Sequence, residues 1–565
     1  MDLNEEQQKA VESNAQDTLV LAGAGTGKTR VLTARVEYLL SKGISPYDIL
    51  CFTFTNKAAR EMKWRIKNET ISISTFHSFC LPFLIPNLGR MGFTSENIKI
   101  YSEIESMRVI NQIIEQFEPN CSNKELRGYI SNIKNSVSLP ISSIELQSQV
   151  YTCFKAYQEI LKKRNALDLD DIIYYFNHLL DIEPLEYSYI LVDECQDTNP
   201  IQYEIIKKLR GEQNHLFMVG DDDQSIYSFR GADPYLILKY KEEFQPETHI
   251  LTKNYRSTNL IIELSSKLIS NNKNRIQKQY QFIRKFQAEI EIIPSDNNRH
   301  EGIQLCSIIQ QFINHGYTYN DIVVLYRNKN LIEHLEPYLK AIPHSSIKTN
   351  LLESDEIKTI IDIYKYLLDP TDEILLSNLI KNPIFGYTNS FYLELKKHKK
   401  IEELKPLLDK LFILQEDFNH LPLEDFYAKL IQVLNLKDHF IETQNKLEAF
   451  KEYFQDLPNI NPKETIKKLI YNLTLDNIKE SPNNQVHFMT IHQSKGLEYP
   501  IVIILGLEEG ILPSYKSNIE EERRILYVAI TRSKDNCILM YNKKRFLYGQ
   551  QHTQKESRFL TEIKE

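Results

Sequence analysis

Residues 22–29 read Ala-Gly-Ala-Gly-Thr-Gly-Lys-Thr, a glycine-rich stretch between an apolar run and a helical pattern. The run before it, Thr18 to Leu21, reads as a short buried strand, and Arg30 to Leu40 carries apolar residues at helical spacing. A strand, a glycine loop and a helix N-terminus in this order form a concavity of backbone N–H groups that favours anions. The stretch therefore predicts a phosphate-binding loop within an α/β domain.

The cofactor expected at this loop is a nucleoside triphosphate with Mg²⁺. Lys28 can reach the β- and γ-phosphates, and the Thr29 hydroxyl can join the coordination shell of the metal ion. The glycines let the backbone close around the phosphates. The residues predicted to surround the nucleotide here are Ala22, Gly23, Ala24, Gly25, Thr26, Gly27, Lys28, Thr29 and Arg30.

Composition limits the class of protein. At 565 residues the chain is expected to hold three to five domains of about 100–200 residues each. No apolar stretch reaches the length of a membrane span, and the acidic start lacks the features of a signal peptide, so a cytoplasmic protein is expected. The seven cysteines are scattered without a Cys-x-x-Cys pair, which predicts neither a zinc site nor a disulfide framework.

Charge gives a weaker signal. A formal net charge of −8 argues mildly against a protein that simply coats nucleic acid, because phosphate neutralisation needs clustered Lys and Arg. Two stretches are nevertheless basic, Lys63 to Lys67 and Asn271 to Lys285. At this stage each is as compatible with a solvated helix face as with a nucleic-acid contact.

Two further apolar runs end in polar residues. Tyr189 to Asp193 reads as a strand followed by Glu194; in a phosphate-loop ATPase the first acid holds Mg²⁺ and the second orients or deprotonates water. Leu216 to Gly220 reads as another strand, followed by Gln224, whose amide can bond a γ-phosphate or a water. Next come Tyr227 and Phe229, flat faces on which bases can stack at about 1–3 kcal/mol per base.

Three stretches further along the chain complete the pattern. They are Asn254-Tyr255-Arg256-Ser257, Thr490 to Glu498, and Glu520 to Lys534, the last of which contains Arg532. Guanidinium groups suit a γ-phosphate because they stay charged and present a fork of donors. The arginines of these stretches are therefore candidate phosphate contacts: Arg256, Arg523, Arg524 and Arg532.

In order and content these motifs resemble the superfamily 1 helicases of the UvrD/Rep type. Leu3 to Val11 is similar to the family's adenine-reading glutamine motif, which assigns that role to Gln7. Phe52 to Met62 and Ser74 to Phe79 resemble its two early DNA-contact motifs. The later motifs follow in family order, so matches extend from Leu3 to Arg532.

The resemblance implies two RecA-like α/β domains, built on parallel sheets flanked by helices, with ATP in the cleft between them. The first is predicted at 1–79 and 172–254, and the second at 255–350 and 480–565. Two mainly helical inserted subdomains are predicted at 80–171 and 351–479, the second short for the family. The strand pattern agrees, with apolar runs near Leu19, Leu50, Ile190 and Phe217, and at Ile322–Tyr326, Val486–Met489, Ile501–Leu505 and Cys537–Tyr541.

The resemblance also implies the site residues. Lys28, Thr29 and Asp193 would hold phosphate and metal, Glu194 would activate water, and Gln224, Arg256 and Arg532 would complete the catalytic set. Tyr255 would stack on adenine and Glu498 would meet the ribose. The residues implied to contact single-stranded DNA are Phe54, His77, Tyr227, Phe229 and His492.

The chain departs from the family at two of these positions. Phe229 stands where most members carry Trp, and the only tryptophan of the chain, Trp64, lies elsewhere. The smaller ring predicts weaker stacking. Cys195 stands where the family usually has Phe, which leaves the neighbouring acids in place but changes the packing behind them.

Two functions remain open. The first is an ATP-driven DNA helicase that moves 3′ to 5′ on single strands and at junctions with duplex, in DNA repair or replication. The second is an ATP-gated module that binds or senses DNA ends for a partner enzyme, as a helicase-like subunit of a phage-defence system would. A partner protein would bind through the short second insertion or the C-terminus. RNA stays possible as a substrate, and a fused nuclease is not expected because about thirty residues follow Arg532.

Overall fold

The computed structural model describes residues 3–345 except 69, 95–97, 234, 285–288 and 336, and residues 484–564 except 516, 548 and 549. Between these ranges it describes 355–370, 404–418 and 420–436, with short pieces at 375–376, 379–380, 382, 385, 447, 450 and 465–466. The chain forms two compact units, Met1–Ile347 with Asn483–Glu565, and Lys348–Pro482. No helix in the described ranges is long and apolar enough to cross a membrane.

A six-stranded parallel sheet carries the phosphate-binding stretch, with the strand order β3-β2-β6-β7-β1-β8. Leu19 pairs with Met218, and Leu50 pairs with Ile190, on neighbouring strands. The strands are β1 (Asp17–Ala22), β2 (Ile49–Phe52), β3 (Ser72–Ser74), β6 (Tyr189–Val192), β7 (His215–Gly220) and β8 (Glu247–Leu251). Because β6, β7 and β1 are parallel neighbours, the polar segments that follow them open at the same edge of the sheet.

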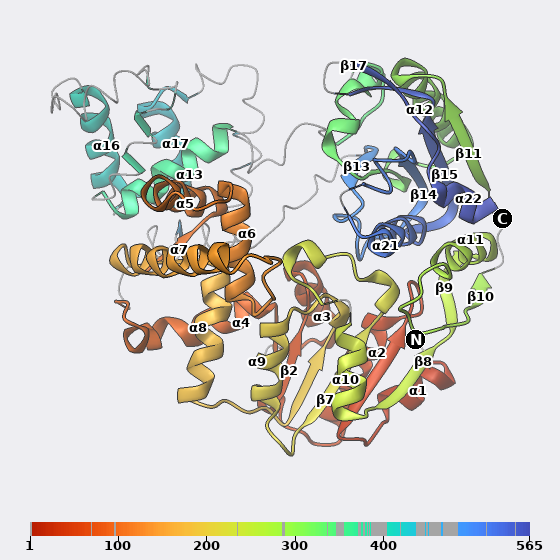
Figure 1. Ribbon diagram of the computed structural model, residues 1–565, viewed down its shortest axis with the longest axis horizontal. Helices are drawn as coiled ribbons and strands as arrows, with labels where there is room; N and C mark the ends of the chain where they lie inside the picture. The colour runs from red at the N-terminus through yellow and green to blue at the C-terminus, as the bar shows by residue number, and fades with distance from the viewer. Residues whose placement is uncertain are drawn as a thin grey trace. The chain divides into compact units, whose positions relative to one another are not determined.

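Helices cover this first sheet. In Figure 1 the yellow helices α9 (Pro200–Arg210) and α10 (Leu236–Phe244) lie in front of the strands. The other helices of this domain are α1 (Glu5–Val11), α2 (Lys28–Ser41) and α3 (Asn56–Ile66). Val31, Leu32 and Val36 of α2 are fully buried against the apolar strands, as the helical spacing after the loop predicted.

A second parallel sheet has the order β11-β15-β14-β12-β13. Its strands are β11 (Ile290–Ser295), β12 (Ile322–Tyr326), β13 (His487–Thr490), β14 (Tyr499–Leu505) and β15 (Ser533–Asn542). Apolar clusters cover both faces, packed by α11 (Asn259–Ile269), α12 (Asn298–Asn314), α21 (Ile519–Ile530) and α22 (Arg558–Lys564). The strands predicted from the sequence are present in both sheets.

Three smaller pairings accompany the sheets. β9 (Lys253–Thr258) leads from the first sheet toward the second and pairs in parallel with β10 (Gln281–Arg284). β16 (Lys544–Leu547) and β17 (Gln550–Thr553) form an antiparallel pair after the second sheet. β4 (Lys99–Tyr101) and β5 (Ala166–Asp168) pair in parallel inside the stretch that was expected to be mainly helical.

That stretch, between β3 and β6, forms a helical layer around its own core. Its helices are α4 (Phe76–Asn87), α5 (Glu103–Phe117), α6 (Asn123–Lys134), α7 (Ile144–Lys163) and α8 (Leu169–Ile182). Capping boxes start α5 at Ser102, α6 at Ser122 and α8 at Asp168, satisfying backbone donors that the helices leave open. Figure 1 shows α5, α6 and α7 grouped together, in orange and brown.

The described helices of the unit Lys348–Pro482 are α13 (Asp355–Leu368), α16 (Lys405–Phe418) and α17 (Leu423–Val433). Ile360, Leu411, Phe418 and Phe426 belong to its separate apolar core. Much of the insertion predicted at 351–479 lies outside the described residues. The four domain ranges given by the sequence stay predictions, because the contacts divide the chain only into the two units.

Candidate nucleotide site and aromatic platform

The phosphate-binding stretch forms the loop from the end of β1 to the start of α2. Gly25 and Gly27 have φ values of +74° and +93°, in the left-handed region that side chains disfavour. The Thr26 hydroxyl donates to the Gly23 carbonyl at 2.9 Å, which closes the turn, and α2 begins at Lys28. The loop thus ends at a helix N-terminus, the arrangement expected of an anion site.

Gln7 lies against this loop. Its Nε2 donates to the Thr26 carbonyl at 3.0 Å, and a Cβ added to Gly27 would lie 2.8 Å from that nitrogen. The side chain is held a second time, because its Oε1 accepts the Asn4 backbone N–H in the capping box of α1. The glutamine predicted to read adenine is therefore fixed beside the phosphate loop.

The acidic pair follows β6 at the same edge of the sheet. Glu194 has a left-handed φ of +49°, and its Oε1 lies 3.2 Å from the Lys28 ammonium. Burial opposes ionisation of Glu194, but Lys28 and Lys495 outweigh it and lower its pKa to about 2. Burial and the neighbouring Glu194 raise the pKa of Asp193 to about 7. Glu194 is thus the ionised member of the pair.

Two arginines approach from the side of the second sheet. Arg256, on β9, forms an ion pair with Glu498 at 2.7 Å and donates to the Thr531 carbonyl at 3.2 Å. Arg532, 1% exposed, donates to Gln224 Oε1 at 3.1 Å. Burial lowers the pKa of Arg532 to about 9, with Arg256 contributing in the same direction, which leaves the guanidinium charged at neutral pH.

Residues around Arg256 also cover the loop itself. The Tyr255 backbone N–H donates to the Gly25 carbonyl at 2.9 Å, and Asn254 Nδ2 donates to the Ala24 carbonyl at 2.7 Å. A Cβ on Gly25 would lie 2.6 Å from Arg256 Cβ. The Tyr255 hydroxyl accepts Asn4 Nδ2 at 2.8 Å, while 42% of the residue stays exposed. The structure thus brings the first half of β9 into direct contact with the loop.

Sequence reasoning missed Lys495 and Asp197. The Lys495 ammonium lies 2.5 Å from Asp197 Oδ2, donates to the Gln224 carbonyl at 2.6 Å and sits over the Tyr227 ring at 5.2 Å. Burial raises the pKa of Asp197 to about 6 even with this partner. Lys495 stands inside the stretch Thr490 to Glu498, and Asp197 follows the acidic pair by three positions. Their pairing across 298 positions could not be read from the sequence.

Two side chains of the basic stretch Asn271 to Lys285, Arg275 and Lys278, have a role that differs from both readings of the stretch. Lys278, 1% exposed at its side chain, pairs with Asp221, Asp222 and Asp223, and Arg275 forms two hydrogen bonds to Asp223. The carboxylates of these three aspartates are close enough together to hold a cation, and the Lys278 ammonium is the cation that lies among them. Neither basic side chain is solvated, because both neutralise the aspartates of the segment that carries Gln224. Lys285 lies outside the described residues.

An aromatic platform adjoins the site, formed by Phe54, Tyr227, Phe229 and His492. The Phe54 and Tyr227 rings stack with centroids 4.7 Å apart, and Phe229 meets His492 edge to face at 5.3 Å. The Tyr227 hydroxyl donates to the His492 carbonyl at 3.1 Å. Phe229 is 67% exposed, so one flat apolar face is open.

His77 lies in the neighbouring segment, in the first turn of α4, and is half-buried. The Asn56 side-chain oxygen accepts the hydroxyls of Thr75 and Ser78 on either side of it, which ties this turn to the start of α3. Cys195 is fully buried, and a Cβ on Gly220 would lie 2.5 Å from its Sγ. The cysteine thus fills the space between the acidic pair and the end of β7.

Comparison with known proteins decides the family. The model of the UvrD/REP helicase N-terminal domain matches residues 3–245, and that of the UvrD-like helicase C-terminal domain matches 249–459 and 423–544. The chain belongs to the UvrD/REP helicase family. The predictions of this family, of two RecA-like α/β domains and of a helicase-class enzyme are confirmed.

Relatives match over nearly the whole chain of this family member. It is 32% identical to a protein named ATP-dependent DNA helicase PcrA from Staphylococcus epidermidis, over 100% of this chain and 86% of the relative. It is 33% identical to the protein of the same name from Bacillus subtilis, over 99% of this chain and 85% of the relative. The Staphylococcus aureus protein of that name is 31% identical, with 100% and 86% covered.

Proposed function

We propose that this protein is an ATP-dependent DNA helicase that hydrolyses ATP at the loop Gly23–Gly27 and moves 3′ to 5′ along single-stranded DNA. The hydrogen bond from Arg532 to Gln224 carries the proposal, because it joins a segment of the second RecA-like domain to one of the first. The relatives named ATP-dependent DNA helicase support it. The polarity, a role in DNA repair or replication and a cytoplasmic location rest on the family resemblance.

The nucleotide would lie between the loop and β9. Gln7 would read the adenine edge, Tyr255 would stack on the ring, and Glu498 would bond the ribose. The exposed Tyr255 ring supports this assignment, as does the fixed position of Gln7 beside Thr26. The N–H groups at the start of α2 would bind the phosphates, since the N-terminus of a helix carries partial positive charge.

Thr29 and Asp193 fit a Mg²⁺ ion. Asp193 is 7% exposed, and burial favours the protonated form of its carboxyl, so a divalent cation beside it would restore the ionised form. Thr29 follows Lys28 in the first turn of α2, where its hydroxyl can reach the same space. The ion would neutralise phosphate charge as it does in phosphate-loop ATPases.

Hydrolysis would proceed through exchange of the ion pairs seen at the site. Lys28 would exchange Glu194 for phosphate oxygens, which frees an ionised carboxylate to orient and deprotonate water. Arg256 would leave Glu498 for the γ-phosphate, and Lys534 would keep Glu498 in place from 2.8 Å. Arg532 and Gln224 would then meet the developing charge together.

The single strand would cross the platform of Phe54, Tyr227, Phe229 and His492, with His77 as a neighbouring contact. Base stacking of about 1–3 kcal/mol per base would hold it without reading sequence. Three positions separate Gln224 from Tyr227, and Lys495 contacts both. A change at the phosphate site would therefore reach the strand through a short, packed segment.

Duplexes with 3′ or 5′ single-stranded tails test the proposal. We expect ATP-dependent unwinding of the 3′-tailed DNA duplex, and no hydrolysis in Lys28→Ala. Hydrolysis on single strands without any strand displacement would favour the DNA-end sensing module instead. RNA duplexes of the same sequence test whether the protein prefers DNA or RNA, because a stacking platform alone does not distinguish the two sugars.

Phe229→Ala and Phe229→Trp test the platform separately. We expect the alanine variant to lose single-strand affinity by about 1–3 kcal/mol, and the tryptophan variant to match or exceed the wild type. Basal ATP hydrolysis without DNA serves as the control for both variants. Unchanged strand affinity in Phe229→Ala would exclude this ring from the strand path.

A further inference from the structure

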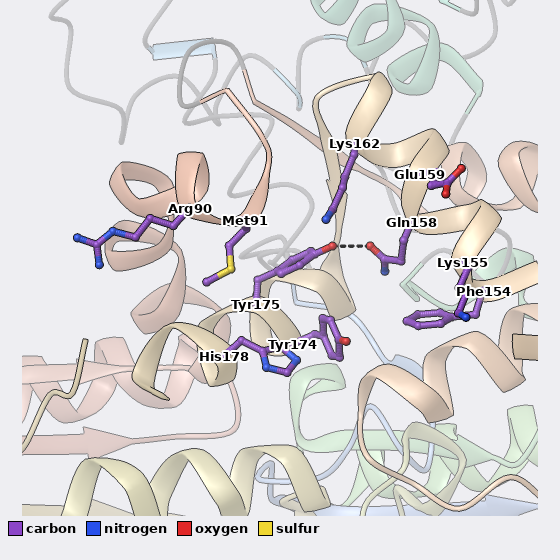
Figure 2. Close-up of a pocket in the computed structure, with 10 residues that line it drawn as sticks. All are labelled: Arg90, Met91, Phe154, Lys155, Gln158, Glu159, Lys162, Tyr174, Tyr175 and His178. Carbon is purple, nitrogen blue, oxygen red and sulfur yellow. Dashed lines mark hydrogen bonds between the residues drawn. The ribbon is translucent and has the colours of Figure 1, made fainter. Parts of the chain in front are cut away.

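A cavity of about 490 Å³ opens in the helical insertion between β3 and β6, away from the residues of the nucleotide site (Figure 2). One face each of α7 and α8 lines it, together with Arg90 and Met91 of the short helix η2 (Leu88–Met91). Sites for small ligands have volumes of about 300–1,000 Å³. The volume therefore falls within the range of such sites.

The walls are aromatic. Tyr174 meets Tyr175 at 5.2 Å and Phe154 at 6.4 Å between ring centroids, both edge to face. On its other side Tyr174 meets the His178 imidazole at 4.6 Å. Figure 2 shows the Tyr174 ring beside His178 in the cavity. Such a wall offers a flat apolar face to a planar ligand.

Buried hydrogen bonds fix this wall. The Tyr175 hydroxyl donates to Gln158 Oε1 at 2.6 Å, and Gln158 Nε2 donates to Asp171 Oδ1 at 2.8 Å. Asp171 in turn pairs at 2.7 Å with Lys134, both fully buried. A ligand would meet a wall that needs no ordering on binding, which lowers the entropic cost of association.

The rim is cationic. Lys155 and Lys162 lie on α7, and both are exposed. The Lys162 ammonium lies 5.8 Å from the centroid of Phe93 and 5.9 Å from that of Tyr175, and Figure 2 shows it extended toward the Tyr175 hydroxyl. Glu159 is the single acid among the lining residues. In a chain of net charge −8 this concentration of positive charge favours an anion.

We propose that the cavity binds one nucleotide unit, with its base against Tyr174 and its phosphate between Lys155 and Lys162. A bare phosphate would use the lysines but not the rings, whereas a nucleotide uses both. The unit belongs to a single strand of nucleic acid held outside the platform, or to a free mononucleotide. The two sources share this chemistry, and the experiment separates them.

The test is photo-cross-linking of the full-length protein, without ATP, to a single-stranded oligonucleotide that carries 5-iodouridine. Cross-linked peptides are identified by mass spectrometry. We expect cross-links at Tyr174 or Phe154 in addition to those at Tyr227 and Phe229. In Lys155→Ala/Lys162→Ala the cavity cross-link should fall about tenfold or more, the loss expected for charged hydrogen bonds to phosphate.

Lys163→Ala is the matched control, because Lys163 is the exposed neighbour of Lys162 on α7 and does not line the cavity. This variant should cross-link as the wild type does. Tyr174→Leu should lose the cavity cross-link with both lysines present. Excess thymidine 5′-monophosphate that removes only the cavity cross-link identifies a mononucleotide site, and failure to compete identifies a strand site.

Cross-links at Tyr227 and Phe229, with none in the cavity from either the oligonucleotide or free 5-iodouridine 5′-monophosphate, would overturn this inference and leave the proposed helicase function standing. Cavity cross-links that persist unchanged in Lys155→Ala/Lys162→Ala would overturn it as well. Absence of cross-links at both places would count against both proposals. Far-ultraviolet circular dichroism of each variant checks that the substitutions leave the fold intact.

Discussion

The Arg532 guanidinium donates a hydrogen bond to the Gln224 side-chain oxygen at 3.1 Å, joining residues 308 positions apart in the chain. Arg532 follows α21 in the second RecA-like domain, and Gln224 follows β7 in the first. Gln224 Nε2 donates in turn to Asp221 at 2.7 Å, and Asp221 is held by Lys278. Two hydrogen bonds in series thus connect the candidate catalytic arginine to a buried ionic cluster.

Arg532→Ala should lower kcat for DNA-stimulated ATP hydrolysis by about 10³-fold or more, since arginine fingers contribute about 10³–10⁵ in rate. KM for ATP should change far less, because the charge that Arg532 meets develops in the transition state. Steady-state ATPase assays measure both constants. Arg558→Ala removes an exposed arginine paired with Glu509 and should leave kcat unchanged; an equal loss in that variant would point to a general effect of charge.

Gly25→Ala should abolish ATP binding, because a Cβ there would lie 2.6 Å from Arg256 Cβ at a φ of +74°. Gly43→Ala is the matched control, with a φ of +82° and nothing within 4 Å of the added Cβ. Both variants bear the left-handed strain of about 1–2 kcal/mol. Binding of a fluorescent ATP analogue should therefore be lost only in Gly25→Ala, and equal loss in both would assign the effect to strain.

Asn4→Ser should raise KM for ATP about fivefold, the effect of one lost hydrogen bond of about 1 kcal/mol. Serine keeps the cap of α1 but is too short to reach the Tyr255 hydroxyl that Asn4 Nδ2 contacts at 2.8 Å. Tyr255→Phe removes the same bond from the other side. The double variant should be no worse than either single variant; additive losses would show that the two residues act independently.

Lys278→Met should leave Asp221, Asp222 and Asp223 without the cation that now lies among them. Removing one partner of a buried ion pair costs about 3–5 kcal/mol, so the thermal midpoint should fall. Ca²⁺ should recover part of that loss in the variant, because the three carboxylates are close enough together to bind an ion. The thermal midpoint of the wild type should not rise through Ca²⁺ binding at this cluster, because Lys278 occupies it. Scanning calorimetry of both proteins with and without Ca²⁺ measures these midpoints.

Glu301→Gln should change how stability depends on pH. Burial opposes ionisation of Glu301, but Arg545 and His334 outweigh it and hold its pKa below the usual 4.5. The unfolded carboxyl therefore takes up a proton first as pH falls. The stabilisation is complete above pH 4.5 and is lost as pH falls through the lower folded value.

At neutral pH we expect this variant to be destabilised by about 3–5 kcal/mol, since Arg545 would keep only Glu508 as a charged partner. Thermal unfolding at a series of pH values tests the sign. The difference between wild type and variant should shrink below pH 4.5. A constant difference across that range would show that the Glu301 charge does not stabilise the fold.

Local patterns predicted the features that depend on neighbours in the chain. The loop at Gly23–Gly27, the strands around it and the acidic pair at Asp193 are written in short stretches whose geometry follows from φ preferences and apolar runs. The role of Lys278 could not be predicted from its local basic stretch, because its three aspartate partners lie more than fifty positions upstream. Lys495 and Asp197 were missed in the same way.

By itself, then, the sequence determined the strand segments, a phosphate-binding loop and the order of the motifs, because each depends on interactions within a few residues. Tertiary structure alone decided which charges meet. Glu194 pairs with Lys28 because β6 and β1 end at the same edge of the first sheet, and Arg256 pairs with Glu498 although 242 positions separate them. Lys495 pairs with Asp197 because the two sheets place their loops together. Pairing in space depends on packing, which residue spacing does not record.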